Sequence, residues 1–148
     1  MTQTDPLALP PGEITLRLLL APFDAAFGQD DTREVVVNEP GRFGVEGENG
    51  WTWHTDPRVT YHLCEAIARL AGHATGQDVS EAHPFCSSRL PGRQRITISM
   101  PPMAPPGTIH LTIRQRAKSF NPTLDWLEDK GWFRFTEGTE AEGRSFRP

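Results

Sequence analysis

Lysine is scarce in this 148-residue chain, which contains only Lys118 and Lys130, and neither of them follows a glycine. A phosphate-binding P-loop ends in Gly-Lys-Ser/Thr, so the chain as given carries no Walker motif. It also lacks a Gly-x-Ser-x-Gly elbow, a His-Glu-x-x-His pair and a Cys-x-x-Cys pair, which mark hydrolase, metalloprotease and redox or zinc sites. These absences predict that the chain is not a complete enzyme by itself.

Cysteines and long apolar runs are also few. Cys64 and Cys86 are the two cysteines, and so few thiols are typical of a reduced cytosolic protein. The longest apolar run covers residues 18–23, far short of the ~20 residues that span a bilayer, and no signal peptide opens the chain. We therefore expect a cytoplasmic protein that folds as a single domain.

Acidic residues are missing from one stretch. Residues 1–83 carry 13 acidic and 5 basic side chains, whereas residues 84–118, the acid-free segment, carry 6 basic and no acidic ones. The six are Arg89, Arg93, Arg95, Arg114, Arg116 and Lys118. Such a segment is typical of either a solvated basic face or an anion-facing surface. The net charge of −4 argues against a dedicated nucleic-acid binder.

Apolar spacing predicts a first helix over residues 13–27, with an apolar stripe of Leu16, Leu19, Leu20 and Phe23. Pro22 is expected to kink or shorten it. The stripe fits either a membrane-surface helix or a helix packed on a sheet, and the absence of a basic face favours the sheet.

A second helix is predicted to begin at Asp56, as N-cap, with Pro57 in its first turn, and to end at Gly76. Its expected apolar face consists of Val59, Leu63, Ile67, Leu70 and Ala74. His62 and Cys64 on this helix do not share a face, so they cannot chelate a metal together. Cys64 is therefore expected to be a small core residue, and no metal site is predicted.

Alternating apolar residues predict strands over residues 34–38, 42–46, 51–54, 95–100 and 108–115. The Asn49-Gly50 pair is typical of a hairpin turn. Trp51 and Trp53 share one strand face, which indicates either packing on the sheet or a ligand platform, the former being the commoner use. In the strand over 108–115, Ile113 is expected to face the core and Arg114 the opposite side.

A short helix over residues 123–130 ends the predicted order. The result is an α+β fold with an antiparallel, PAS-like sheet of about five to six strands and a long helix and shorter helices packed on it. We expect an irregular lead over residues 1–12, one domain over 13–135, and a linker or tail over 136–148 that leads toward an absent C-terminal domain.

Five short motifs follow one another along the chain: residues 34–41 (EVVVNEPG), Gly50-Trp51, residues 90–96 (LPGRQRI), Pro101-Pro102 and residues 112–114 (TIR). Together they make residues 16–133 resemble the N-terminal domain of the VirB-eleven-like traffic ATPases of type IV secretion and conjugation. Two departures stand out: Gly92-Arg93 replaces the Asp/Asn-Gly pair usual in the family's turn, and Arg116 stands near the position where the family more often has proline. The family continues into a RecA-like motor domain with the Walker lysine.

The resemblance implies a hexameric ring in which nucleotide sits between the two domains, with ATP and Mg held mainly by the motor domain. The positions that match the family's phosphate-contacting arginines are Arg95 and Arg114, whose guanidinium forks suit phosphate oxygens. It further implies protein transport, partners among other secretion ATPases and inner-membrane components, and a cytoplasmic location at the inner membrane. No catalytic residue is expected in this part of the protein.

Two other functions are compatible with the residues alone. One is a stand-alone α+β module whose acid-free segment binds a small anion, and the other is a nucleic-acid-binding module. A Gly-x-x-x-x-Gly-Lys-Ser/Thr motif encoded downstream would favour the ATPase.

Overall fold

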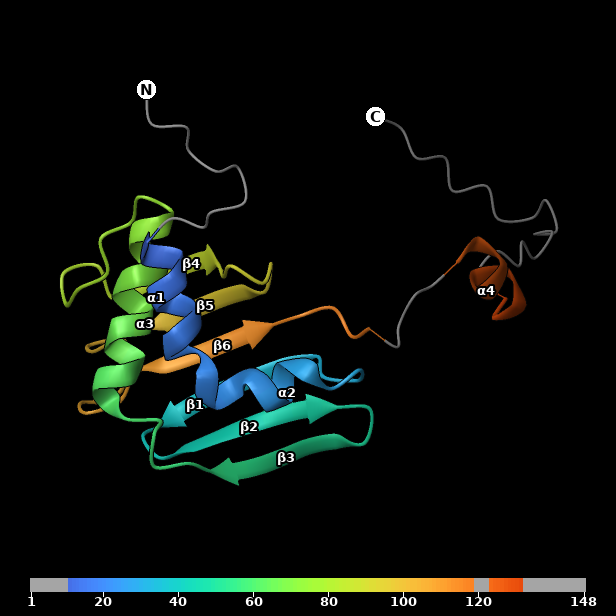
Figure 1. The fold of residues 1–148 in the computed structure, drawn as a ribbon, viewed down its shortest axis with the longest axis horizontal. Helices are drawn as coiled ribbons and strands as arrows, with labels where there is room; N and C mark the ends of the chain where they lie inside the picture. Colours follow the sequence, from blue (N-terminus) through green and yellow to red (C-terminus); the bar gives the residue numbers. More distant parts are fainter. Residues whose placement is uncertain (1–10, 119–122, 132–148) are drawn as a thin grey trace, which may run out of the picture.

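The computed structural model describes residues 11–118 and 123–131 (Figure 1). A six-stranded sheet in the order β3-β2-β1-β6-β5-β4, with every neighbouring pair antiparallel, forms its centre. The strands are β1 Glu34–Glu39, β2 Arg42–Gly47, β3 Gly50–Thr55, β4 Phe85–Arg89, β5 Arg95–Ser99 and β6 His110–Arg114. The predicted α+β class with an antiparallel sheet is confirmed.

Helices cover one face of this sheet, as Figure 1 shows for α1 and α3. The helical elements are α1 Pro11–Leu19, the 3-10 helix η1 Ala21–Phe23, α2 Asp24–Gly28, α3 Tyr61–Ala74 and α4 Leu124–Asp129. Leu16, Phe23 and Ile67 from the helices join Val35 and Ile113 from the strands in one buried cluster. The core therefore lies between the sheet and α1–α3, and the other face of the sheet, the open face, carries the outward side chains of all six strands.

The first predicted helix is present but divided. Leu16, Leu20 and Phe23 are buried and Leu19 is half-buried, so the stripe packs in the core, as expected, and does not form a membrane-surface helix. The helix starts at Pro11, two residues earlier than predicted, and breaks into α1, η1 and α2 around Pro22. The break follows from proline, which cannot donate the backbone hydrogen bond that a continuous helix needs.

The predicted start of the second helix is wrong. The N-cap is Thr60, whose hydroxyl accepts a hydrogen bond from the Leu63 amide at 3.0 Å. Asp56 instead accepts hydrogen bonds from the Arg58 amide at 2.9 Å and from the Arg58 guanidinium at 2.7 Å. This local turn uses the carboxylate that would have capped a helix, which explains the shift of four residues.

The predicted apolar face of the second helix is confirmed in part, because Ile67 is buried and Leu63 and Leu70 pack against the core. Cys64, Ile67, Ala68, Ala71 and Gly72 are buried, whereas Ala74 is exposed. Gly72 is required by close packing, because a Cβ atom there would lie 2.4 Å from a methyl group of Val79. Small residues at i, i+4, i+7 and i+8, counted from Cys64, let the helix pack closely, and they give a weaker periodic signal than leucines do.

Strand β4 was not predicted. Its inward residues are Cys86 and Ser88, and a serine at a core position hides the apolar alternation. Ser88 is 4% exposed, and its hydroxyl donates to the Ala71 carbonyl of α3 at 2.7 Å, which satisfies this buried polar group. The strand therefore packs against α3 through a polar contact.

Helix α4 agrees with the prediction over residues 123–130, and its N-cap Thr123 accepts a hydrogen bond from the Trp126 amide at 3.1 Å. The predicted lead over residues 1–12 lies outside the described part of the chain, except for residues 11 and 12, which begin α1. The predicted tail over residues 136–148 lies entirely outside it. The domain limits therefore stay predictions.

Candidate functional site

The two arginines predicted to contact phosphate lie side by side on the open face. Strands β5 and β6 place Arg95 directly opposite Arg114 in their antiparallel register. The neighbouring Ile96 and Ile113 are fully buried, so strict alternation sends both guanidinium groups away from the helices. The prediction that Arg114 points away from the core is confirmed.

A shallow hollow of about 320 Å³ lies at these arginines and is lined by Ser87, Arg95, Thr97, Thr112 and Arg114. All five side chains come from the three strands β4, β5 and β6, which lie within the acid-free segment. The hollow offers two guanidinium groups and three hydroxyl groups and no carboxylate. This set of hydrogen-bond donors suits an oxyanion such as phosphate.

Arg114 is already paired with an acidic residue. Its Nε donates to Glu34 Oε2 at 2.6 Å across the β1–β6 pair, and the Arg114 side chain is 73% exposed. The hydrogen bond to Glu34, followed by the negative charge of that carboxylate, raises the pKa of Arg114. An anion that approaches this hollow must therefore compete with Glu34 for Arg114, whereas Arg95 makes no ion pair with any described residue.

Charge changes sign along one row of the open face. Successive register partners across the sheet are Trp51, Glu46, Glu34, Arg114, Arg95 and Arg89. Acidic side chains thus occupy the β1–β2 side and basic side chains the β4–β6 side. Sequence reasoning identified the basic side but missed Glu34, because the β1–β6 pairing joins residues 80 positions apart.

The tryptophans lie on the same open face, at the β3 edge. Trp51 and Trp53 stack with ring centroids 6.3 Å apart, and each is 46% exposed. The Arg42 guanidinium lies 4.6 Å from the Trp53 ring centroid. Gly44 on β2 makes room for this ring, because a Cβ atom there would lie 3.1 Å from it. The pair therefore packs on the outer surface of the sheet and outside the core.

Both cysteine thiols are buried in the core. Burial raises the pKa of Cys64 from 9.0 to about 11, and it shifts the pKa of Cys86 in the same direction. This agrees with the expected role of Cys64 as a small core residue. No group of three or more metal-ligating side chains occurs within residues 11–118 and 123–131.

The raised pKa of Cys64 makes stability depend on alkaline pH. The unfolded chain ionises this thiol near pH 9 and the folded chain near pH 11; stability is therefore full below about pH 9 and falls as the pH rises through this window. We expect the free energy of unfolding to drop by up to about 2 kcal/mol by pH 11. Urea unfolding between pH 7 and 11 measures it, and Cys64→Ala should remove most of this slope; an equal slope in the variant would contradict the assignment.

No helix in the described part of the chain is long and apolar enough to cross a membrane.

No model of a known protein family matches the chain. Individual relatives do. VirB11 of Rhizobium radiobacter is 40% identical over 100 residues, which are 68% of this chain and 29% of that protein. Type IV secretion system protein VirB11 of Bartonella henselae is 33% identical over 119 residues, 80% of this chain and 33% of that protein. PtlH of Bordetella pertussis, also a type IV secretion system protein, is 33% identical over 101 residues, 68% of this chain and 30% of that protein.

A solved structure agrees with these relatives. The VirB11 ATPase of the Brucella suis type IV secretion system, in complex with sulphate, superposes with a TM-score of 0.74 and 26% identity, and the match covers 93% of this chain and 40% of that one.

The six-stranded antiparallel sheet with helices on one face is thus an α+β fold that this chain shares with a type IV secretion ATPase. The chain belongs to the VirB11 family, as the sequence motifs predicted. It spans about a third of the length of the relatives that it matches.

Proposed function

We propose that this chain is the N-terminal domain of a hexameric type IV secretion or conjugation ATPase and that it closes over ATP held mainly by a P-loop motor domain. The observation that carries the proposal is the placement of Arg95 opposite Arg114 on the helix-free face of the sheet. Both arginines match the family's phosphate-contacting motifs, and no helix in the described part of the chain covers them. In this proposal the open face of the sheet meets the motor domain.

The residues of the hollow fit the phosphate part of this role. Two guanidinium groups can form several charge-assisted hydrogen bonds to a terminal phosphate, and domain closure then depends on whether that phosphate is present. The Brucella suis relative was solved in complex with sulphate, an oxyanion of similar shape. Magnesium would be held by the motor domain, as the family resemblance implies.

The further roles follow from the same assignment. We propose that the domain contributes to ring assembly and docks the ATPase to other secretion ATPases and inner-membrane components from the cytoplasmic side.

A chimera tests the proposal. This chain would replace the matching segment of Bartonella henselae VirB11, and we expect the chimera to assemble as a hexamer and to hydrolyse ATP within about tenfold of the parent. The chain alone should show no hydrolysis above a mock-purified sample, because it lacks the Walker lysine that phosphoryl transfer by P-loop ATPases requires. Light scattering and steady-state kinetics measure both properties. Turnover by the chain alone, or a folded chimera that neither assembles nor hydrolyses ATP, would contradict the proposal.

A further inference from the structure

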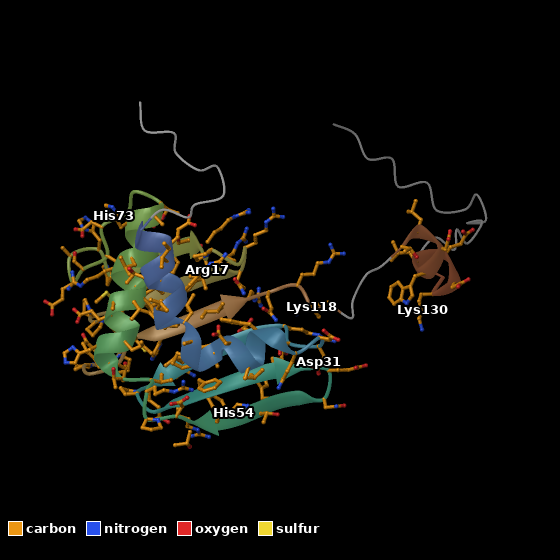
Figure 2. The ribbon with its side chains drawn as sticks, in the orientation of Figure 1. Arg17, Asp31, His54, His73, Lys118 and Lys130 are labelled. Atoms are coloured by element: carbon orange, nitrogen blue, oxygen red, sulfur yellow. The ribbon has the colours of Figure 1, made fainter. Side chains whose placement is uncertain are left out.

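A second group of cations gathers at one end of the sheet. A hollow of about 420 Å³ is lined by Arg93, Arg116 and Lys118, together with Gln94, Gln115 and Phe27. Arg93 comes from the turn between β4 and β5, whereas Arg116 and Lys118 follow the end of β6. Figure 2 shows Lys118 just beyond that strand end. The fold thus brings together three cations from two segments, and the lining contains no carboxylate.

Arg93 occupies a backbone conformation that arginine rarely adopts. Its φ angle is 68°, and it is the one non-glycine residue with positive φ in the described part of the chain. The turn is closed by hydrogen bonds from the Arg93 amide to the Leu90 carbonyl at 2.9 Å and from the Leu90 amide to the Gln94 carbonyl at 2.8 Å. Glycine adopts this conformation without strain. A strained non-glycine residue suggests a use for its side chain beyond the turn itself.

The other side of the hollow is held in place. The Gln115 amide donates to the Arg33 carbonyl at 3.0 Å, and the Gln115 side chain donates to the Phe27 carbonyl at 3.2 Å. Ala117 is buried, so Arg116 and Lys118 project from an anchored segment. None of the three cations forms an ion pair with a described residue. A neighbouring hollow shares Phe27 and Gln94 with this one, and its lining includes one carboxylate, that of Asp24.

Two arginines that are far apart in the sequence meet in this hollow. Arg93 stands at the left-handed position of the turn between β4 and β5, and Arg116 follows the end of β6. Both line the same space, and each adds a positive charge to it. A solvated basic face would not require an arginine at a strained position, because Arg89 and Arg95 nearby already supply charge from ordinary strand positions.

We propose that Arg93, Arg116 and Lys118 form a binding site for a phosphate group, separate from the Arg95–Arg114 hollow. Three cations, two of them with guanidinium forks, suit the multiple charge and several acceptor oxygens of a phosphate better than the single charge of a carboxylate. The phosphate belongs either to a soluble phosphorylated compound or to the headgroup of an anionic lipid. The proposal needs no motor domain and does not rest on the proposed ATPase function.

The first experiment titrates the 148-residue chain with inorganic pyrophosphate at low salt and follows backbone amide signals by NMR. We expect saturable shifts at residues 92–94 and 115–118. Arg93→Gly should weaken binding about three- to tenfold while raising the melting temperature by about 1–3 °C, because glycine relieves the strained φ angle. If Arg93 had only a structural role, a variant that stabilises the fold would not bind pyrophosphate more weakly.

Arg89→Gln is the matched control, since it removes one positive charge from the same acid-free segment outside the hollow. It should change the pyrophosphate affinity by less than twofold. The proposal is overturned if Arg89→Gln weakens binding as much as Arg93→Gly, or if the shifts centre on Arg95 and Arg114. The latter result would leave the proposed ATPase function intact.

Vesicle sedimentation identifies the source of the phosphate. The chain and Arg93→Gly are compared on vesicles with and without phosphatidylglycerol. Binding of pyrophosphate without vesicle binding supports a soluble phosphorylated ligand, and Arg93-dependent binding to phosphatidylglycerol vesicles supports a lipid headgroup. The absence of both overturns the site.

Discussion

In the complete ATPase, Arg95→Ala and Arg114→Ala are each expected to reduce ATP turnover by about ten- to a hundredfold while leaving the fold nearly intact. Both side chains project from the open face, and their replacement removes no core contact. An arginine that stabilises a transferring phosphate can contribute 10³–10⁵ in rate, but our proposal places these arginines on a domain that closes over a nucleotide held elsewhere, so a smaller effect is expected. Steady-state kinetics on the variants, with melting curves, measure it.

Arg89→Ala is the control for this prediction. Arg89 belongs to the same acid-free segment and lies opposite Arg95 in the β4–β5 register, but it does not line the Arg95–Arg114 hollow. A diffuse basic surface would respond to the loss of any of these charges alike and would be screened at ~0.15 M salt. If Arg89→Ala reduces turnover as much as the other two variants, the assignment of phosphate contacts to Arg95 and Arg114 is wrong.

Phe23→Ala is expected to cost about 3–5 kcal/mol of the free energy of unfolding. Phe23 is fully buried, and its ring packs edge-on against Phe43 of β2 with the ring centroids 5.2 Å apart. The centroid of the Phe27 ring lies 6.3 Å from that of Phe23. The substitution leaves a large cavity where η1 packs on the sheet. Since a domain of this size has a total stability of roughly 5–15 kcal/mol, the loss is between about a fifth and all of it.

Urea unfolding followed by circular dichroism measures this loss, and Leu18→Ala is the control. Leu18 lies five residues earlier, on α1, and is 71% exposed, so its replacement should change stability by less than about 0.5 kcal/mol. A loss below about 1.5 kcal/mol for Phe23→Ala would mean that the segment over α1 and α2 contributes little to the core.

Local patterns in the sequence were sufficient wherever side-chain period and turn chemistry decide the structure. The leucine stripe identified the first helix, and the Asn49-Gly50 pair identified the β2–β3 hairpin. The alternation in β5 and β6 assigned Ile96 and Ile113 to the core and the adjacent arginines to the open face. These predictions hold because helices and strands have fixed periods of 3.6 and 2 residues.

Predictions failed where polar or small side chains carry the packing. Strand β4 was missed because Ser88 occupies a core position through its hydrogen bond to α3. On α3 the buried Ala68, Ala71 and Gly72 were missed, because small side chains give a weak hydrophobic signal. Hydrophobic pattern alone underestimates such residues, since they bury little apolar area themselves.

The sequence by itself determined the α+β class, the position of the acid-free segment, the absence of a Walker lysine and the motif positions of Arg95 and Arg114. Only the tertiary structure decided which charges meet: Glu34 takes Arg114 as its partner from 80 residues away, while Arg93 and Arg116 line one hollow. The physical reason is that the β1–β6 pairing and the position of the β4–β5 turn beside the end of β6 depend on strand order, and strand order is set by how the whole core packs.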